Sequence, residues 1–126
     1  RYTIFISIFI FILHSVEEYL TGFYNVDSFF NFVFGDSNIF PSLKINFIVF
    51  QVIWWLFLLI ILSLSFKNKL SSLFLFLFGL VYIFELHHII KALVFNIYYP
   101  GLITSILFPV LGFFYWRELI INLKIK

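Results

Sequence analysis

The chain has 126 residues, of which 63% are hydrophobic and 11% are charged, and its net charge at pH 7 is +2. The small net charge excludes nucleic acid as an expected partner, and the absence of Cys excludes disulfides, thiol nucleophiles and Cys-ligated metals. A soluble domain averages about 25% charged residues and a small one buries only about 60–70% of its unfolded surface, so the composition predicts a protein whose solvent is the lipid bilayer.

The first apolar run, residues 2–24, is long enough to cross a membrane, because runs of 18 or more apolar residues are candidate transmembrane helices. It carries His14, Glu17 and Glu18, which the apolar region of a signal peptide would not. We therefore expect this helix to be retained. Since the sequence contains no Met, we also expect it to begin inside a longer chain.

A polar connection, residues 25–42, follows the first run. Within it, Ser28–Phe34 is short and aromatic, with Asp27 as a candidate N-cap and Gly35 as a candidate stop. This pattern predicts a short helix lying in the outer interface of the membrane. Its aromatic side chains could cover a site in the membrane as a lid.

Three further apolar runs complete the chain, over residues 43–66, 70–95 and 102–123. Pro109 lies inside the last run and is expected to kink it. No internal repeat or domain boundary interrupts the pattern. The predicted fold class is all-α, a single transmembrane domain over residues 1–126 that forms an integral membrane bundle of about four helices.

The basic residues predict how the bundle is oriented. With four spans, most of them fall on one side of the membrane, namely Arg1, Lys67, Lys69, Arg117, Lys124 and Lys126. Lys44, Lys91, Asp27 and Asp36 fall toward the other side. The positive-inside rule then places both termini in the cytoplasm, and the expected location is the inner (plasma) membrane of a bacterium. A three-span arrangement with residues 43–66 re-entrant would break this charge pattern.

The most informative feature of the sequence is a set of ionisable residues inside the first and third predicted spans. An ionised group at the bilayer centre costs about 2.5–3.5 kcal/mol, so such a gathering is not expected by chance. At 1.5 Å per residue, the groups of the two spans lie at the same height to within about one helical turn, in the outer half of the membrane. The set consists of His14, Glu17, Glu18, Glu85, His87 and His88.

The spacing of these residues favours a metal site. The three groups of the first span share a helix face, since they stand at i, i+3 and i+4. Glu85 and His88 share a face of the third span, whereas His87 points roughly opposite Glu85, so His88 is the better-placed histidine. Carboxylate and imidazole at i, i+3 on facing helices build di-metal sites in bundle proteins, and these ligands suit Zn, Fe or Mn. We expect one or two divalent metal ions, with structural ion pairing and a proton relay as the alternatives.

The residues His14-Ser15-Val16-Glu17-Glu18 match the signature of the HXXEE family of small integral membrane proteins. That family also carries a downstream histidine, here His87 or His88, and a Tyr-x-Pro-Gly motif, here Tyr98-Tyr99-Pro100-Gly101. The resemblance spans most of the chain. The family is described as having no established function, so what the resemblance implies is that these residues act as one unit.

The pattern predicts a small intramembrane metal-dependent enzyme. A bound metal would acidify a water molecule, Glu17 or Glu18 would serve as general base, and Tyr98 would lean over the site as a hydrogen-bond donor. Hydrolysis of a lipid-like or isoprenoid ester fits best, with an iron-dependent hydroxylase or desaturase as an alternative reaction.

The non-enzymatic alternative is a proton- or ion-conducting module, or an accessory subunit of a larger membrane complex, that uses the same residues. Haem ligation by two histidines is disfavoured, because the neighbouring carboxylates would be costly beside a porphyrin. Helical membrane proteins of this size often pair, so a homo-oligomer stays open.

Overall fold

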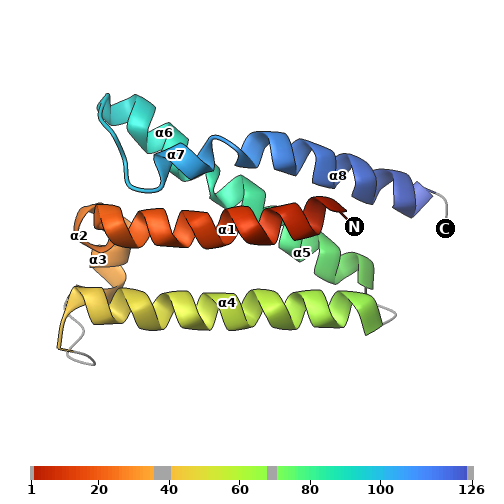
Figure 1. Cartoon of the computed structure of the whole chain (residues 1–126), viewed down its shortest axis with the longest axis horizontal. Coiled ribbons are helices and arrows are strands. Elements are labelled where there is room, and N and C mark those ends of the chain that lie inside the picture. The colour runs from red at the N-terminus through yellow and green to blue at the C-terminus, as the bar shows by residue number, and fades with distance from the viewer. Residues whose placement is uncertain (1, 36–40, 68–70, 125–126) are drawn as a thin grey trace.

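The computed structural model describes residues 2–35, 41–67 and 71–124 (Figure 1). Their elements are α1 (Tyr2–Thr21), α2 (Phe23–Val26), α3 (Ser28–Phe34), α4 (Leu43–Lys67), α5 (Ser71–Phe84), α6 (Leu86–Phe95), α7 (Leu102–Ser105) and α8 (Phe108–Lys124). Within these described ranges, four helical segments are long and apolar enough to span a membrane, namely Tyr2–Thr21, Leu43–Ser65, Ser71–Phe95 and Leu102–Asn122. The prediction of an all-α integral membrane bundle with four spans is confirmed.

The chain between the first two spans follows the predicted local signals. α1 ends at Thr21, three residues earlier than expected, because Gly22 takes the left-handed conformation with φ 74°, which glycine adopts without steric cost. The short helix α3 has the predicted bounds. The Asp27 side chain accepts a hydrogen bond from the Phe30 backbone N–H at 2.7 Å, which is the expected N-cap contact.

The third and fourth spans each contain a break in the helix. The third span breaks at Glu85, between α5 and α6, and the fourth breaks at residues 106–107, between α7 and α8. The kink expected from Pro109 lies one turn before that residue, because proline has no N–H to donate to the carbonyl of Ser105. Both interruptions lie near the polar residues of the first span.

Figure 1 shows α1 and α4 side by side, with α5 crossing them obliquely. α5 packs on α4 and also on α8. The two ends of the chain lie at the same end of the bundle (Figure 1), as an even number of spans requires. The cytoplasmic placement of that end stays a prediction. Of the charged residues on which this prediction depends, four lie outside the described residues, namely Arg1, Asp36, Lys69 and Lys126. For Lys67 and Lys124 only the helical backbone is described.

Among the side chains that the structure describes, the buried ones form two aromatic clusters. The first joins α1, α4, α5 and α8 around Phe11 and includes Phe108, whose ring stacks on that of Phe11 with 4.9 Å between centroids. The second joins α2, α3, α4 and α6 around Phe23 and Phe47. Large apolar side chains such as Leu93, which is 76% exposed, point outward, as expected for a surface facing lipid. The polar residues lie between the two clusters.

Candidate metal centre

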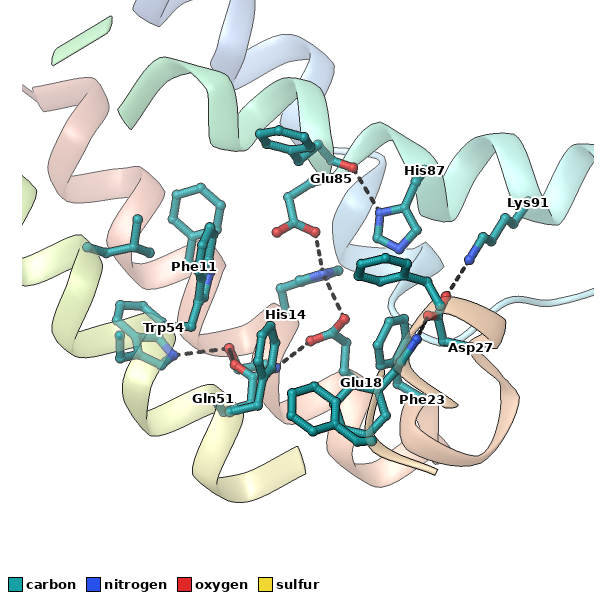
Figure 2. Close-up of a pocket in the computed structure, with 18 residues that line it drawn as sticks. Phe11, His14, Glu18, Phe23, Asp27, Gln51, Trp54, Glu85, His87 and Lys91 are labelled. Carbon is teal, nitrogen blue, oxygen red and sulfur yellow. Dashed lines mark hydrogen bonds and ion pairs between the residues drawn. The ribbon is translucent and has the colours of Figure 1, made fainter. Parts of the chain in front are cut away.

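Two imidazoles and a carboxylate, those of His14, His88 and Glu85, converge between α1 and the junction of α5 with α6. Figure 2 shows two of these groups, His14 and Glu85, facing each other. Nε2 of His14 lies 3.2 Å from Nε2 of His88 and 3.0 Å from Oε2 of Glu85, and the His88–Glu85 distance is 3.3 Å. His14 is 3% exposed and His88 is fully buried. Because these ligand atoms all lie within 4.8 Å of one another, the three residues could hold a metal ion.

Glu18 stands beside this group without being part of it. Its Oε1 lies 3.3 Å from Nε2 of His88 and 3.7 Å from Nε2 of His14. The amide of Gln51, in α4, donates to Oε2 of Glu18 at 2.7 Å and accepts from the hydroxyl of Ser15 at 3.1 Å. The second span therefore holds the Glu18 carboxylate at the edge of the cluster.

The ring proton of His88 can be assigned from its partner. Nδ1 lies 2.5 Å from the carbonyl oxygen of Pro100, and a carbonyl oxygen accepts but never donates. Nδ1 therefore carries a proton and donates it. Because a neutral imidazole carries one ring proton, Nε2 of neutral His88 presents a lone pair to the cluster.

The ring proton of His14 can be assigned in the same way, through the hydroxyl of Thr104. Its Nδ1 lies 2.7 Å from Oγ1 of Thr104, and this hydroxyl donates to Oε2 of Glu17 at 2.6 Å. The hydroxyl has a single proton, so its oxygen accepts the proton of Nδ1. Nε2 of neutral His14 thus also presents a lone pair. Histidines that bind metals almost always donate their other ring N–H in this manner.

Glu17 points away from the cluster, toward the start of the fourth span. It accepts hydrogen bonds from the hydroxyls of Tyr98 and Thr104, both at 2.6 Å, and from the backbone N–H groups of Ile103 and Thr104 at 2.9 and 2.8 Å. Glu17 and Glu18 were expected to share one face with His14, and the structure places them on either side of it. Of these two glutamates, Glu18 is the one whose carboxylate contacts the imidazoles.

The Tyr-x-Pro-Gly segment closes over the site. Gly101 has φ 84°, and a Cβ there would lie 2.7 Å from Cε1 of His14 and 2.9 Å from Cε1 of His88. Tyr98 was expected to lean over the cluster, but its hydroxyl instead donates to Glu17. Burial of Tyr98 and its hydrogen bond to the Glu17 carboxylate raise the pKa of Tyr98 to about 12, so it remains a donor at neutral pH. Tyr98, Pro100 and Gly101 each contact one part of the candidate site.

His87 lies next to the cluster but outside it. Its Nδ1 is 2.8 Å from the carbonyl oxygen of Phe84, and its ring packs against that of His88 with 3.9 Å between centroids. His87 lines the neighbouring cavity. The structure therefore brings His88, and not His87, into contact with His14 and Glu85.

A second polar cluster went unrecognised in the sequence. Asp27 accepts hydrogen bonds from the ammonium of Lys91 and from the hydroxyl of Tyr99, the latter at 2.6 Å. Burial opposes ionisation of Asp27, but these bonds and the Lys91 charge outweigh it and lower the pKa of this carboxyl below its usual value. The sequence signal was limited to the N-cap pattern, because nothing in it relates Asp27 to a lysine 64 residues away. Thr104 was also missed, since a single threonine in a span carries no pattern.

A cavity of about 560 Å³ opens beside the centre. Figure 2 shows His14, Glu18 and Glu85 along one part of its wall. Most of the remaining wall consists of Phe and Trp side chains, which come from all five helices between α1 and α5 and include Phe30 and Trp54. The candidate centre therefore faces an aromatic space of the size that binds small organic ligands.

These features define the class of protein: an integral membrane protein with four candidate spans and a buried His/Glu group that could hold a metal. Residues 5–115 match the family model described as "Protein of unknown function with HXXEE motif", and the chain belongs to this family. No curated protein and no solved structure matches the chain. The resemblance noted from the His14–Glu18 motif is thereby confirmed.

Proposed function

We propose that the chain is an intramembrane metal-dependent enzyme whose metal is held by His14, Glu85 and His88. The observation that carries the proposal is the approach of two Nε2 lone pairs and a carboxylate oxygen to within 3.0–3.3 Å of one another. The ring protons of both imidazoles are directed to other partners. Three such electron-rich atoms repel one another in a site with little water unless a proton or a metal ion lies between them, and the proposal places a metal ion there.

The separations also suit a first-row divalent metal. Zn²⁺ binds His nitrogen and Glu oxygen at about 2.0–2.2 Å with tetrahedral geometry, which places neighbouring ligand atoms about 3.3–3.6 Å apart. The distance of 3.3 Å between His88 and Glu85 lies at the lower end of this range, and the other two, 3.0 and 3.2 Å, are slightly shorter. Fe²⁺ and Mn²⁺ accept the same ligand types. Two histidines and one glutamate leave a fourth position for water or substrate, which is the pattern of catalytic zinc sites.

The residues around the three ligands then take distinct roles. A bound metal ion supplies Lewis acidity and lowers the pKa of a bound water molecule. Glu18 is the general base, since its carboxylate stands at the edge of the cluster and is oriented by Gln51. Glu17 and Tyr98 are positioning residues, because they act on His14 through Thr104.

The reaction that this arrangement supports best is ester hydrolysis. The oxygen of water bonds to the ester carbonyl carbon, and Glu18 takes the proton of that water. The bond between the carbonyl carbon and the alcohol oxygen then breaks, and Glu18 returns the proton to the leaving alcohol. The aromatic cavity beside Glu18 favours a lipid-like ester.

The test is elemental analysis of the protein purified without chelator and incubated with Zn²⁺, Fe²⁺ or Mn²⁺. We expect near-stoichiometric metal in the wild type and its loss in His14→Ala and in His88→Ala. His87→Ala is the matched control, because this neighbouring histidine lies outside the cluster, and it should retain the metal. A wild-type protein that takes up none of the three ions contradicts the proposal.

A second candidate, a proton relay, is favoured by the chain of close polar contacts from Glu17 through Thr104 to His14 and Glu85. This chain is hydrogen-bonded throughout when Nε2 of His14 also carries a proton. A relay would carry no metal. Glu85→Gln would abolish proton flux in liposomes that contain the protein, whereas the metal-dependent enzyme would show no such flux in the wild type.

A further inference from the structure

The cavity beside the centre is closed at its inner end by apolar side chains. Phe11 of α1 and Leu58 of α4 line this end, and they are 4% and 2% exposed. Both belong to the first aromatic core cluster. Figure 2 shows Phe11 and Trp54 on one side of His14 and Asp27 on the other, so His14 lies between these two groups of lining residues.

The outer end of the cavity differs in chemistry. Asp27, His87 and Lys91 line it, together with aromatic side chains of α3. Phe29 of α3 is 71% exposed, so this end borders the surface of the molecule. The charges of Asp27 and Lys91 compensate each other through their contact, which leaves the outer end polar without a large net charge.

We propose that the cavity binds a neutral amphiphile with a single apolar chain. The chain lies toward Phe11 and Leu58, its cleavable linkage lies beside Glu85, and its polar end lies near the pair formed by Asp27 and Lys91. This inference rests on the proposed function, because it names the substrate class of the same site.

Two dimensions support a single chain of limited length. The volume of about 560 Å³ falls in the range of pockets that hold one small ligand. Along α1, Phe11 lies seven positions before Glu18, the proposed general base, which corresponds to about 10 Å of helix. An apolar chain that starts beside Glu18 therefore meets Phe11 and Leu58 after a medium length, so these two residues limit the chains that fit.

The fluorescence of two tryptophans in the protein can report whether a chain enters the cavity. Trp54 and Trp55 line the cavity, whereas Trp116 does not. In a Trp116→Phe background, terminally brominated alcohols with hexyl to hexadecyl chains would quench Trp54 and Trp55 when they enter. The protein is placed in nanodiscs of unbrominated phosphatidylcholine, and the alcohols are compared at equal mole fraction. Lipid tails are as apolar as the cavity, so the dependence on chain length reports fit.

We expect the strongest quenching from a chain of medium length. A hexadecyl chain should bind at least about fivefold more weakly, because overfilling a packed interior strains it. Leu58→Ala should move the optimum to longer chains and Leu58→Phe to shorter ones. Ile60→Ala is the matched control, since Ile60 lies on the exposed face of the same helix, and it should leave the optimum unchanged. A variant that merely unfolds would lose quenching at every length.

The proposal is overturned if all chain lengths quench equally, or if the optimum is the same in both Leu58 variants. A control variant carries Phe in place of Trp54 and Trp55 and retains Trp116. Quenching of Trp116 in this variant measures contact with brominated alcohol dissolved in the bilayer, and this background is subtracted. The His14→Ala variant separates this proposal from the proposed function. A length optimum that survives there, in a protein whose wild type binds no metal, supports the cavity assignment and rejects the metal-dependent enzyme.

Discussion

Gly101 lies directly against the imidazole of His14. A Cβ atom at position 101 would come within 2.7 Å of Cε1 of that ring, and within 2.9 Å of the ring of His88. Side-chain atoms do not approach so closely without displacement. The glycine of the Tyr-x-Pro-Gly motif therefore allows the loop to close over both histidines, in addition to permitting φ 84°.

Gly101→Ala should displace the imidazoles and abolish metal binding. The matched control is Gly22→Ala. This position has the same kind of backbone conformation, with φ 74°, but a Cβ there would make only an ordinary van der Waals contact, 3.5 Å from Nδ2 of Asn25. Both variants pay a left-handed strain of about 1–2 kcal/mol, so both should lower the thermal midpoint. Elemental analysis should find metal in the Gly22 variant and none in the Gly101 variant. Equal metal contents would show that the loop does not constrain the histidines.

Thr104→Val should weaken metal binding about 10- to 100-fold, the usual effect of removing a group that orients a ligating histidine. The variant keeps the shape of the side chain but loses the hydroxyl that accepts from His14 and donates to Glu17. Thr104→Ser keeps the hydroxyl and should stay near wild type. Competition with a chelator of known affinity measures both, and a Thr104→Val protein of unchanged affinity would contradict the role given to this hydroxyl.

The variants Glu18→Gln and Glu85→Gln should distinguish the proposed general base from the proposed metal ligand. Glu18→Gln is expected to keep its metal and to lose about 10²- to 10⁴-fold in kcat, the contribution of a general base. Glu85→Gln is expected to lose the metal, because an amide is a poorer ligand than a carboxylate. The measurements are metal content and hydrolysis of p-nitrophenyl octanoate. If Glu18→Gln lost the metal and Glu85→Gln kept it, the two assignments would be reversed.

The contact of Asp27 with Lys91 and Tyr99 should make stability depend on pH. The pKa of Asp27 lies below its usual value of 3.8 in the folded protein, so folding favours its ionised form. This contribution is fully present above the unfolded pKa and is lost as the pH falls through the lower folded pKa. Thermal unfolding should therefore show a stabilising difference between wild type and Asp27→Asn at pH 7 that shrinks below about pH 4. Asn retains the N-cap, so a difference that does not change with pH would contradict this account.

Several features follow from local sequence alone. Hydrophobic runs predicted four spans, because the length of a membrane-crossing helix depends on bilayer thickness and not on neighbouring helices. The helix Ser28–Phe34 followed from a cap at Asp27 and a stop at Gly35, which act within one turn. The constant rise of a helix placed His14 and Glu85 at a common depth, and their 3.0 Å contact agrees with that estimate.

Tertiary structure decided which of these residues meet. Helix periodicity gives relative directions around one axis, but the rotation of each helix toward its neighbours depends on packing. For this reason the sequence left Glu17 and Glu18 equivalent, whereas packing turned Glu18 toward His88 and Glu17 toward Thr104. The approach of Gly101 to the imidazoles likewise depends on a loop that joins two spans. The residue types and their depth were thus local properties, and the ligand set is a property of the assembled bundle.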